Sequence, residues 1–162
     1  MNKINKYGVI ILDFGSQYTQ LIARRIREQN VFSEIMPSET PLSEILIHEP
    51  KGLILSGGPS SVFQSEAPIF DKTVLEADIP IMGICYGLQL LAHHYGGEVE
   101  STGHGEYGLA TISVNNHKGI LSGVPEKSKV WMSHMDRVKK MPEGWEILAQ
   151  SSNNVVAVMA NH

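Results

Sequence analysis

The sequence has little cysteine and no long apolar run, and each absence excludes a class of protein. Cys85 is the single cysteine among the 162 residues, so no disulfide can form within the chain. No apolar stretch reaches the roughly 20 residues that a membrane-spanning helix needs. The apolar run in MNKINKYGVIILDFG is too short for a secretion signal and leads into an acidic residue rather than a small-residue cleavage site. We therefore expect a protein of the reducing cytoplasm.

Excess positive charge and the common metal-binding motifs are also absent. The formal net charge of −4 gives no electrostatic reason to expect nucleic acid or an anionic membrane as a partner. The sequence has no Cys-x-x-Cys, no His-Glu-x-x-His and no EF-hand loop, and no Gly-x-Gly-x-x-Gly follows its first predicted strand. We therefore expect neither a metal site nor a dinucleotide-binding site.

From the N-terminus to the helix that is predicted after Cys85, apolar runs alternate with helical patterns. Such alternation is typical of an α/β fold with a doubly wound, mostly parallel sheet. We predict strands at 7–13, 31–36, 52–56 and 79–84, with helices around 21–27, around 42–47, from Pro68 to about Glu76, and after Cys85.

The pattern changes after Gly96-Gly97, where short strands joined by polar turns follow one another. They are predicted at 108–114, 129–133, 146–150 and 155–160 and would form a small antiparallel extension or flap. We see no repeat, linker or internal boundary, so residues 1–162 are expected to form a single domain.

The segment IMGICYGLQLLAHHY at 81–95 places the cysteine between an apolar run and a helical pattern. Gly83 and Gly87 flank Cys85 at two residues on either side, as in the sharp strand-to-helix turn that carries the nucleophile of hydrolases. The N-terminus of the following helix would favour the thiolate. A lone cysteine is often a buried structural residue, but that role does not require flanking glycines at the end of a strand. Cys85 is therefore a predicted nucleophile.

A second glycine loop, SGGPSS at 56–61, follows the third predicted strand and should lie at the same edge of the sheet. It lacks the Lys-Ser/Thr ending of a P-loop, which counts against phosphate binding. The amides of Gly58 and Tyr86 could form a two-donor oxyanion hole for acyl transfer. The alternative is a tight turn between strand and helix.

Several segments together resemble the class I glutamine amidotransferase domain. The Gly-x-Cys-x-Gly-x-Gln pattern is specific to that class, and DFGSQY at 13–18 with ARR at 23–25 is similar, more narrowly, to the amino-terminal glutaminase domains of the GMP synthase family. The segments that carry the resemblance are 11–28, 55–62, 83–92, 96–97 and 130–136.

The resemblance implies that Cys85 attacks the side-chain amide of L-glutamine, forms a thioester and releases ammonia, after which water frees glutamate. It assigns Gly58 and Tyr86 as the oxyanion-hole amides. The family commonly has glycine where this chain has Met135. The residues that the match assigns to glutamine binding are Gln89, Ser133, Met135 and Asp136.

In the family the ammonia passes to a separate ATP-pyrophosphatase domain or subunit, which uses ATP and Mg to adenylate XMP and then makes GMP. That domain has no counterpart in these residues, and the resemblance implies no cofactor for the glutaminase domain itself. The expected partners are therefore L-glutamine and the synthetase part, with a homodimer expected only for the full-length enzyme.

The family completes its catalytic triad with a His-Pro-Glu segment, and no His-Pro-Glu occurs in the 162 residues. A thiol nucleophile needs a base, and the base needs an acid to orient it. His134 is the best internal candidate because it lies in the predicted pocket segment, while His162 ends the sequence. We therefore expect a fragment of a longer protein with little glutaminase activity.

Two other functions stay open from the residues. The first is a cysteine peptidase or stress-response protein with the same kind of turn, against which Gln89 and the WMSH segment count. The second is a non-catalytic module that docks on a synthetase and regulates it. A reaction of a glutamine-mimicking electrophile that depends on Cys85 would count against this module.

Overall fold

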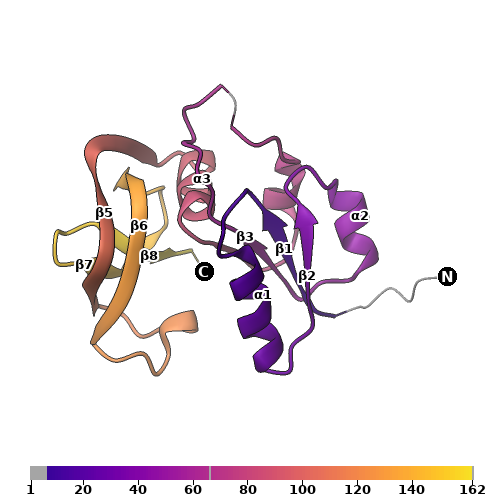
Figure 1. Cartoon of the computed structure of the whole chain (residues 1–162), viewed down its shortest axis with the longest axis horizontal. Coiled ribbons are helices and arrows are strands. Elements are labelled where there is room, and N and C mark those ends of the chain that lie inside the picture. The colour runs from indigo at the N-terminus through magenta and orange to yellow at the C-terminus, as the bar shows by residue number, and fades with distance from the viewer. Residues whose placement is uncertain (1–6, 66, 162) are drawn as a thin grey trace. The chain divides into compact units, whose positions relative to one another are not determined.

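The computed structural model describes residues 7–65 and 67–161. By its internal packing the chain divides into two compact units, one ending at Leu91 and the other beginning at Ala92. Each unit contains one four-stranded sheet, parallel in the first and antiparallel in the second (Figure 1). The predicted α/β class, a doubly wound parallel sheet with an antiparallel extension, is confirmed.

The parallel sheet of the first unit has the strand order β2-β1-β3-β4. The middle of strand β1 is buried, with Ile10, Ile11 and Leu12 at most 1% exposed, as expected for a strand covered on both faces. In the order 2-1-3-4, the chain changes direction between β1 and β3, and ligands of such sheets bind at the carboxyl ends of the strands there. The strands are β1 (Val9–Asp13), β2 (Ser33–Pro37), β3 (Gly52–Leu55) and β4 (Ile81–Gly83).

Among the described residues, three α-helices follow strands of this sheet, and the third continues past Leu91 into the second unit. The first contacts β1 and β2, where Ala23 is completely buried and accepts a hydrogen bond at its carbonyl from Ser33 Oγ at 3.0 Å. None of the helices in the described part of the chain is long and apolar enough to cross a membrane. Their bounds are α1 (Thr19–Glu28), α2 (Leu42–Ile47), which has the predicted ends, and α3 (Tyr86–His94).

The helix predicted from Pro68 to Glu76 is wrong. The chain forms only a short 3₁₀ helix at Lys72–Glu76. Asp71, rather than Pro68, supplies the start signal, because its carboxylate accepts a hydrogen bond from the Thr73 amide at 3.0 Å and caps the first turn. The same carboxylate accepts one from the Leu42 amide at 2.9 Å, and this contact, followed by those with Thr73, lowers the pKa of Asp71.

The antiparallel sheet of the second unit has the strand order β6-β5-β7-β8. Strands β5 and β6 are much longer than predicted. Their additional residues include glycines and charged residues, which obscure the apolar alternation in the sequence but are paired within the sheet. Its core consists of Ile112, Val114, Leu121, Leu148 and Ala149. The strands are β5 (Glu98–Val114), β6 (Lys127–Lys140), β7 (Glu146–Ser151) and β8 (Val156–Ala160).

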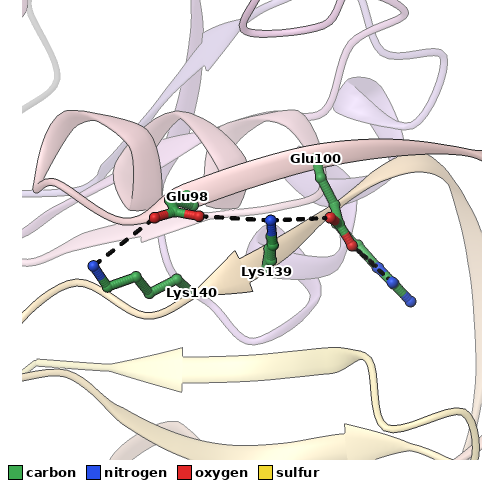
Figure 2. Close-up of polar contacts among 5 residues, drawn as sticks. Glu98, Glu100, Lys139 and Lys140 are labelled. Atoms are coloured by element: carbon green, nitrogen blue, oxygen red, sulfur yellow. Dashed lines mark hydrogen bonds and ion pairs between the residues drawn. The ribbon is translucent and has the colours of Figure 1, made fainter.

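Opposite charges line the end of the β5–β6 pair (Figure 2). Glu100 and Arg137 are direct cross-strand partners, and Arg137 donates from Nε and Nη2 to Glu100 Oε1 at 2.9 and 2.7 Å. Lys139 Nζ lies 3.8 Å from a carboxylate oxygen of both Glu98 and Glu100. These pairs support the register near the irregularity between Glu98 and Val99.

We expect Arg137→Met to lower the free energy of unfolding by about 0.5 to 1 kcal/mol, less at high salt, because the Arg137–Glu100 pair is partly exposed and screened. Urea denaturation at low and high salt measures this loss. Lys140→Met is the matched control, since its single ion pair is longer, at 3.9 Å, and more exposed. An equal loss in both variants would show that the pairing geometry contributes nothing.

Candidate active site

Three loops meet at the carboxyl ends of β1, β3 and β4. The Phe14 amide after β1 donates to Ser56 Oγ after β3 at 2.9 Å. A Cβ atom added to Gly57 would lie 3.5 Å from Cys85 Cβ and 3.5 Å from Ser16 Oγ. The loop after β1, the glycine loop and the cysteine turn are therefore direct neighbours. Their meeting point is the edge at which sheets of this order bind ligands.

Cys85 forms the sharp turn between β4 and α3. Its φ is +50°, a left-handed conformation that is costly for a residue with a Cβ and persists only where the surroundings impose it. The helix begins at the next residue, and the Gln89 amide donates to the Cys85 carbonyl at 3.1 Å. The side chain is exposed. The predicted strand-to-helix turn is thus present, with a strained cysteine at its tip.

The two flanking glycines make this turn possible by close backbone contact. A Cβ on Gly83 would lie 2.4 Å from the Gly87 carbonyl carbon, and a Cβ on Gly87 would lie 2.3 Å from the Leu55 carbonyl oxygen. The Gly87 amide also donates to the Ser56 carbonyl at 3.2 Å. The start of α3 is therefore pressed onto the end of β3, where no side chain fits.

We expect Gly87→Ala to lower the free energy of unfolding by about 1 to 3 kcal/mol, because its methyl group would overlap the Leu55 carbonyl and force the backbone to move. Denaturant unfolding followed by circular dichroism measures the loss. Gly57→Ala is the matched control, since its nearest neighbours are at 3.5 Å, and should change stability by no more than about 0.5 kcal/mol. Similar losses in both would contradict the packing argument.

Two effects act in opposite directions on the Cys85 thiol. Desolvation by the surrounding protein raises its pKa, which disfavours the thiolate. The N-terminus of α3 favours the thiolate. Desolvation also raises the pKa of the neighbouring Tyr86 hydroxyl, whose ring is buried against Phe14 at a centroid distance of 5.4 Å. The raised pKa of Cys85 is the reverse of what the helix position alone predicts.

A raised pKa keeps Cys85 protonated at neutral pH, so its alkylation by iodoacetamide should speed up as pH rises. We expect the rate constant to increase about tenfold per pH unit between pH 7 and pH 8, because only the thiolate reacts. Stopped reactions analysed by mass spectrometry give this profile. A plateau at or below pH 7 would show instead that the α3 N-terminus outweighs desolvation.

The two amides predicted to bind an oxyanion belong to Gly58, in the glycine loop, and to Tyr86, the first residue of α3. The structure gives neither amide a hydrogen-bond acceptor among residues 7–65 and 67–161. Gly58 is held against the loop after β1, where an added Cβ would lie 2.4 Å from the Phe14 carbonyl oxygen. The two amides are available donors for an anionic oxygen. Their role as an oxyanion hole stays a prediction.

The residues predicted to bind glutamine are divided between the units. Gln89 is buried on α3, one helical turn after Cys85. Ser133, Met135 and Asp136 lie on β6 in the second unit. Met135 is exposed and Asp136 is buried. Their contact with glutamine remains a prediction.

His134 has a carboxylate neighbour that the sequence analysis missed. Its Nε2 lies 3.4 Å from Glu106 Oε2, and its Nδ1 lies 3.0 Å from the Asp136 carbonyl oxygen. Glu106 stands on β5, far from His134 in the sequence, and no motif joins the two. His162 lies outside the described residues. In the described ranges, no group of three or more His, Cys, Asp or Glu side chains could hold a metal ion.

A parallel sheet with a strained cysteine at the turn into a helix defines an α/β protein with a cysteine on a sharp strand-to-helix turn. The model of the family "Glutamine amidotransferase class-I" matches residues 10–162. The chain therefore belongs to the class I glutamine amidotransferase family. The resemblance inferred from the motifs is confirmed.

Individual relatives show which members of the family this chain resembles. The chain is 51% identical over 158 residues to a GMP synthase [glutamine-hydrolyzing] of Campylobacter lari and 49% identical over 160 residues to that of Brachyspira hyodysenteriae. It spans 31% of the length of each of these relatives. A crystal structure assigned as a GMP synthase subunit from Thermoplasma acidophilum has a TM-score of 0.83 at 29% identity, over 97% of this chain and 79% of that one. A glutamine amidotransferase of Thermotoga maritima, at 19% identity and a TM-score of 0.74, covers 97% and 72% of the two chains and shares the fold.

Proposed function

We propose that this chain is the glutamine-hydrolysing domain of a GMP synthase, with Cys85 as its nucleophile. The observation that carries the proposal is the cysteine at φ +50° directly before α3, in a chain about half identical to glutamine-hydrolysing GMP synthases. Family membership favours this function over a cysteine peptidase. Because the family model spans residues 10–162, both compact units belong to one functional domain in this proposal.

The proposed reaction transfers the glutamine acyl group to sulfur and then to water. The Cys85 thiolate attacks the side-chain carbonyl carbon, and the amides of Gly58 and Tyr86 donate to the oxygen that becomes negative. Collapse breaks the C–N bond, and the NH₂ group takes up the thiol proton and leaves as ammonia. Water then cleaves the thioester C–S bond, giving glutamate and regenerating the thiol.

The proposed substrate contacts are Gln89, Ser133, Met135 and Asp136, by their positions in the family pattern, which commonly has glycine in place of Met135. The released ammonia serves a synthetase domain or subunit, in which ATP and Mg support the conversion of XMP to GMP in purine biosynthesis. A cytoplasmic location accords with the unpaired Cys85. The sequence has no His-Pro-Glu segment, so proton transfer from Cys85 is unassisted by that family base in these 162 residues.

The direct test is labelling of the chain with 6-diazo-5-oxo-L-norleucine, a glutamine analogue whose diazoketone alkylates an active-site thiol. We expect one label per chain, on Cys85, with a rate that saturates with analogue concentration and falls when glutamine is added. Peptide mapping locates the label, and Cys85→Ala should carry none. Labelling that is linear in concentration and insensitive to glutamine would contradict a glutamine site.

Ammonia release separates the enzyme from the regulatory alternative. Turnover needs proton transfer to the leaving nitrogen, so we expect the 162-residue chain to release ammonia from glutamine slowly, and only with Cys85 present. Saturable labelling together with slow turnover supports the proposal. A non-catalytic docking module predicts neither saturable labelling nor any release that depends on Cys85.

A further inference from the structure

Glu106 joins three elements of the second unit through one largely buried carboxylate. Its Oε1 accepts hydrogen bonds from Ser151 Oγ at 2.9 Å and from Asn153 Nδ2 at 2.8 Å. Its Oε2 faces His134 Nε2 at 3.4 Å, and the two side chains are only 13% and 15% exposed. The carboxylate on β5 thus contacts β6, the end of β7 and the turn that follows β7.

The contacts of His134 determine which ring nitrogen faces Glu106. Nδ1 lies 3.0 Å from the Asp136 carbonyl oxygen, which can only accept, so Nδ1 carries a hydrogen. In a neutral ring, Nε2 would then direct its lone pair at Glu106 Oε2, an oxygen that is buried without a hydrogen-bond partner in the described part of the chain. The contact becomes attractive when one proton is held by the pair.

The pair lies where the strand ladder cannot set the backbone by itself. The β5–β6 register is irregular between Ser101 and Glu106, and regular pairing resumes with Glu106 opposite His134. Gly105 packs tightly on this stretch of β6, since an added Cβ would lie 2.3 Å from the His134 carbonyl oxygen and 3.0 Å from Met135 Cα. Side-chain contacts therefore supplement the ladder along 133–136.

We propose that Glu106 and His134 are positioning residues that fix the backbone of segment 133–136 for glutamine binding. The inference rests on the proposed function, in which Ser133, Met135 and Asp136 contact glutamine. His134 acts through its bond to the Asp136 carbonyl, and Glu106 acts by holding the His134 ring. Such residues set the affinity for glutamine and leave the intrinsic reactivity of Cys85 unchanged.

Saturation kinetics with 6-diazo-5-oxo-L-norleucine separate affinity from reactivity in the full chain. We expect Glu106→Ala to raise the half-saturating concentration roughly tenfold, since misplaced binding groups weaken recognition. The alkylation rate with iodoacetamide, which needs no glutamine pocket, should stay at the wild-type value. A half-saturating concentration equal to that of wild type overturns the proposal. The proposal is also overturned if the labelling rate with the glutamine analogue and the alkylation rate with iodoacetamide change by the same factor, because this indicates general unfolding.

Glu106→Gln is the rescue variant. Its carboxamide oxygen can still accept from Ser151 and Asn153, and its N–H can donate to Nε2 of a neutral His134. We expect half-saturation within about twofold of wild type. His134→Ala removes the other partner and should match Glu106→Ala. A His134→Ala value at the wild-type level, or a Glu106→Gln value as high as that of Glu106→Ala, overturns the proposal.

Glu146→Ala is the matched control. Glu146 is also a bonded carboxylate of this sheet, held by Asn116 Nδ2 at 3.0 Å and Lys118 Nζ at 3.5 Å, but it starts β7 and pairs with Ala160. We expect its half-saturating concentration to stay at the wild-type value, and a tenfold rise would overturn the specific role of Glu106. If the wild-type chain itself shows no saturable labelling, the proposed function fails and this inference fails with it. Saturable wild-type labelling with an unaffected Glu106→Ala refutes the positioning role alone.

Discussion

The contact of Gly87 with the carbonyl of Leu55 is the constraint on which the first unit depends. It brings the start of α3 against the end of β3, at a distance where an added Cβ would lie 2.3 Å from that oxygen. The short connection from β4 must then turn sharply, and Cys85 takes a φ of +50°. The strain in the turn is held by backbone packing on both sides, so the position of the sulfur is a property of the whole edge of the sheet.

The same edge supplies the polar groups around the cysteine. Ser56 joins two loops, because its hydroxyl accepts from the Phe14 amide at 2.9 Å and donates to the Gly57 carbonyl, also at 2.9 Å. The Ser56 side chain thus adds to the backbone bond from its own amide to the Leu12 carbonyl, at 3.0 Å, in placing the start of the glycine loop. Preorganised amides of this kind stabilise developing charge without having to reorient. Because the pKa of Cys85 is raised by desolvation, the proposed reaction depends on proton removal as well as on geometry.

In the second unit, side-chain contacts stabilise the strand pairing where the backbone register is irregular. Along β5 and β6 the register breaks between Glu98 and Val99 and again between Ser101 and Glu106. At the first break, the pair Glu100–Arg137 bridges the strands. At the second, Glu106 connects His134 with Ser151. Where backbone pairing is interrupted, cross-strand charges and hydrogen bonds take over the placement of the chain.

The sequence by itself determined the α/β class, helix α2 with its ends, the glycine loop and the presence of a turn at Cys85, because each leaves a local pattern of apolar residues or glycines. The packing of Gly87 on Leu55, which forces that turn, came only from the fold. It misled at 68–76, where Asp71 caps a shorter helix and binds the Leu42 amide, and it understated the length of β5 and β6. Only the tertiary structure decided the contacts between Ser56 and Phe14, 42 residues apart, and between Glu106 and Ser151, 45 residues apart. Such partners leave no local pattern, since the fold alone brings them within reach of one another.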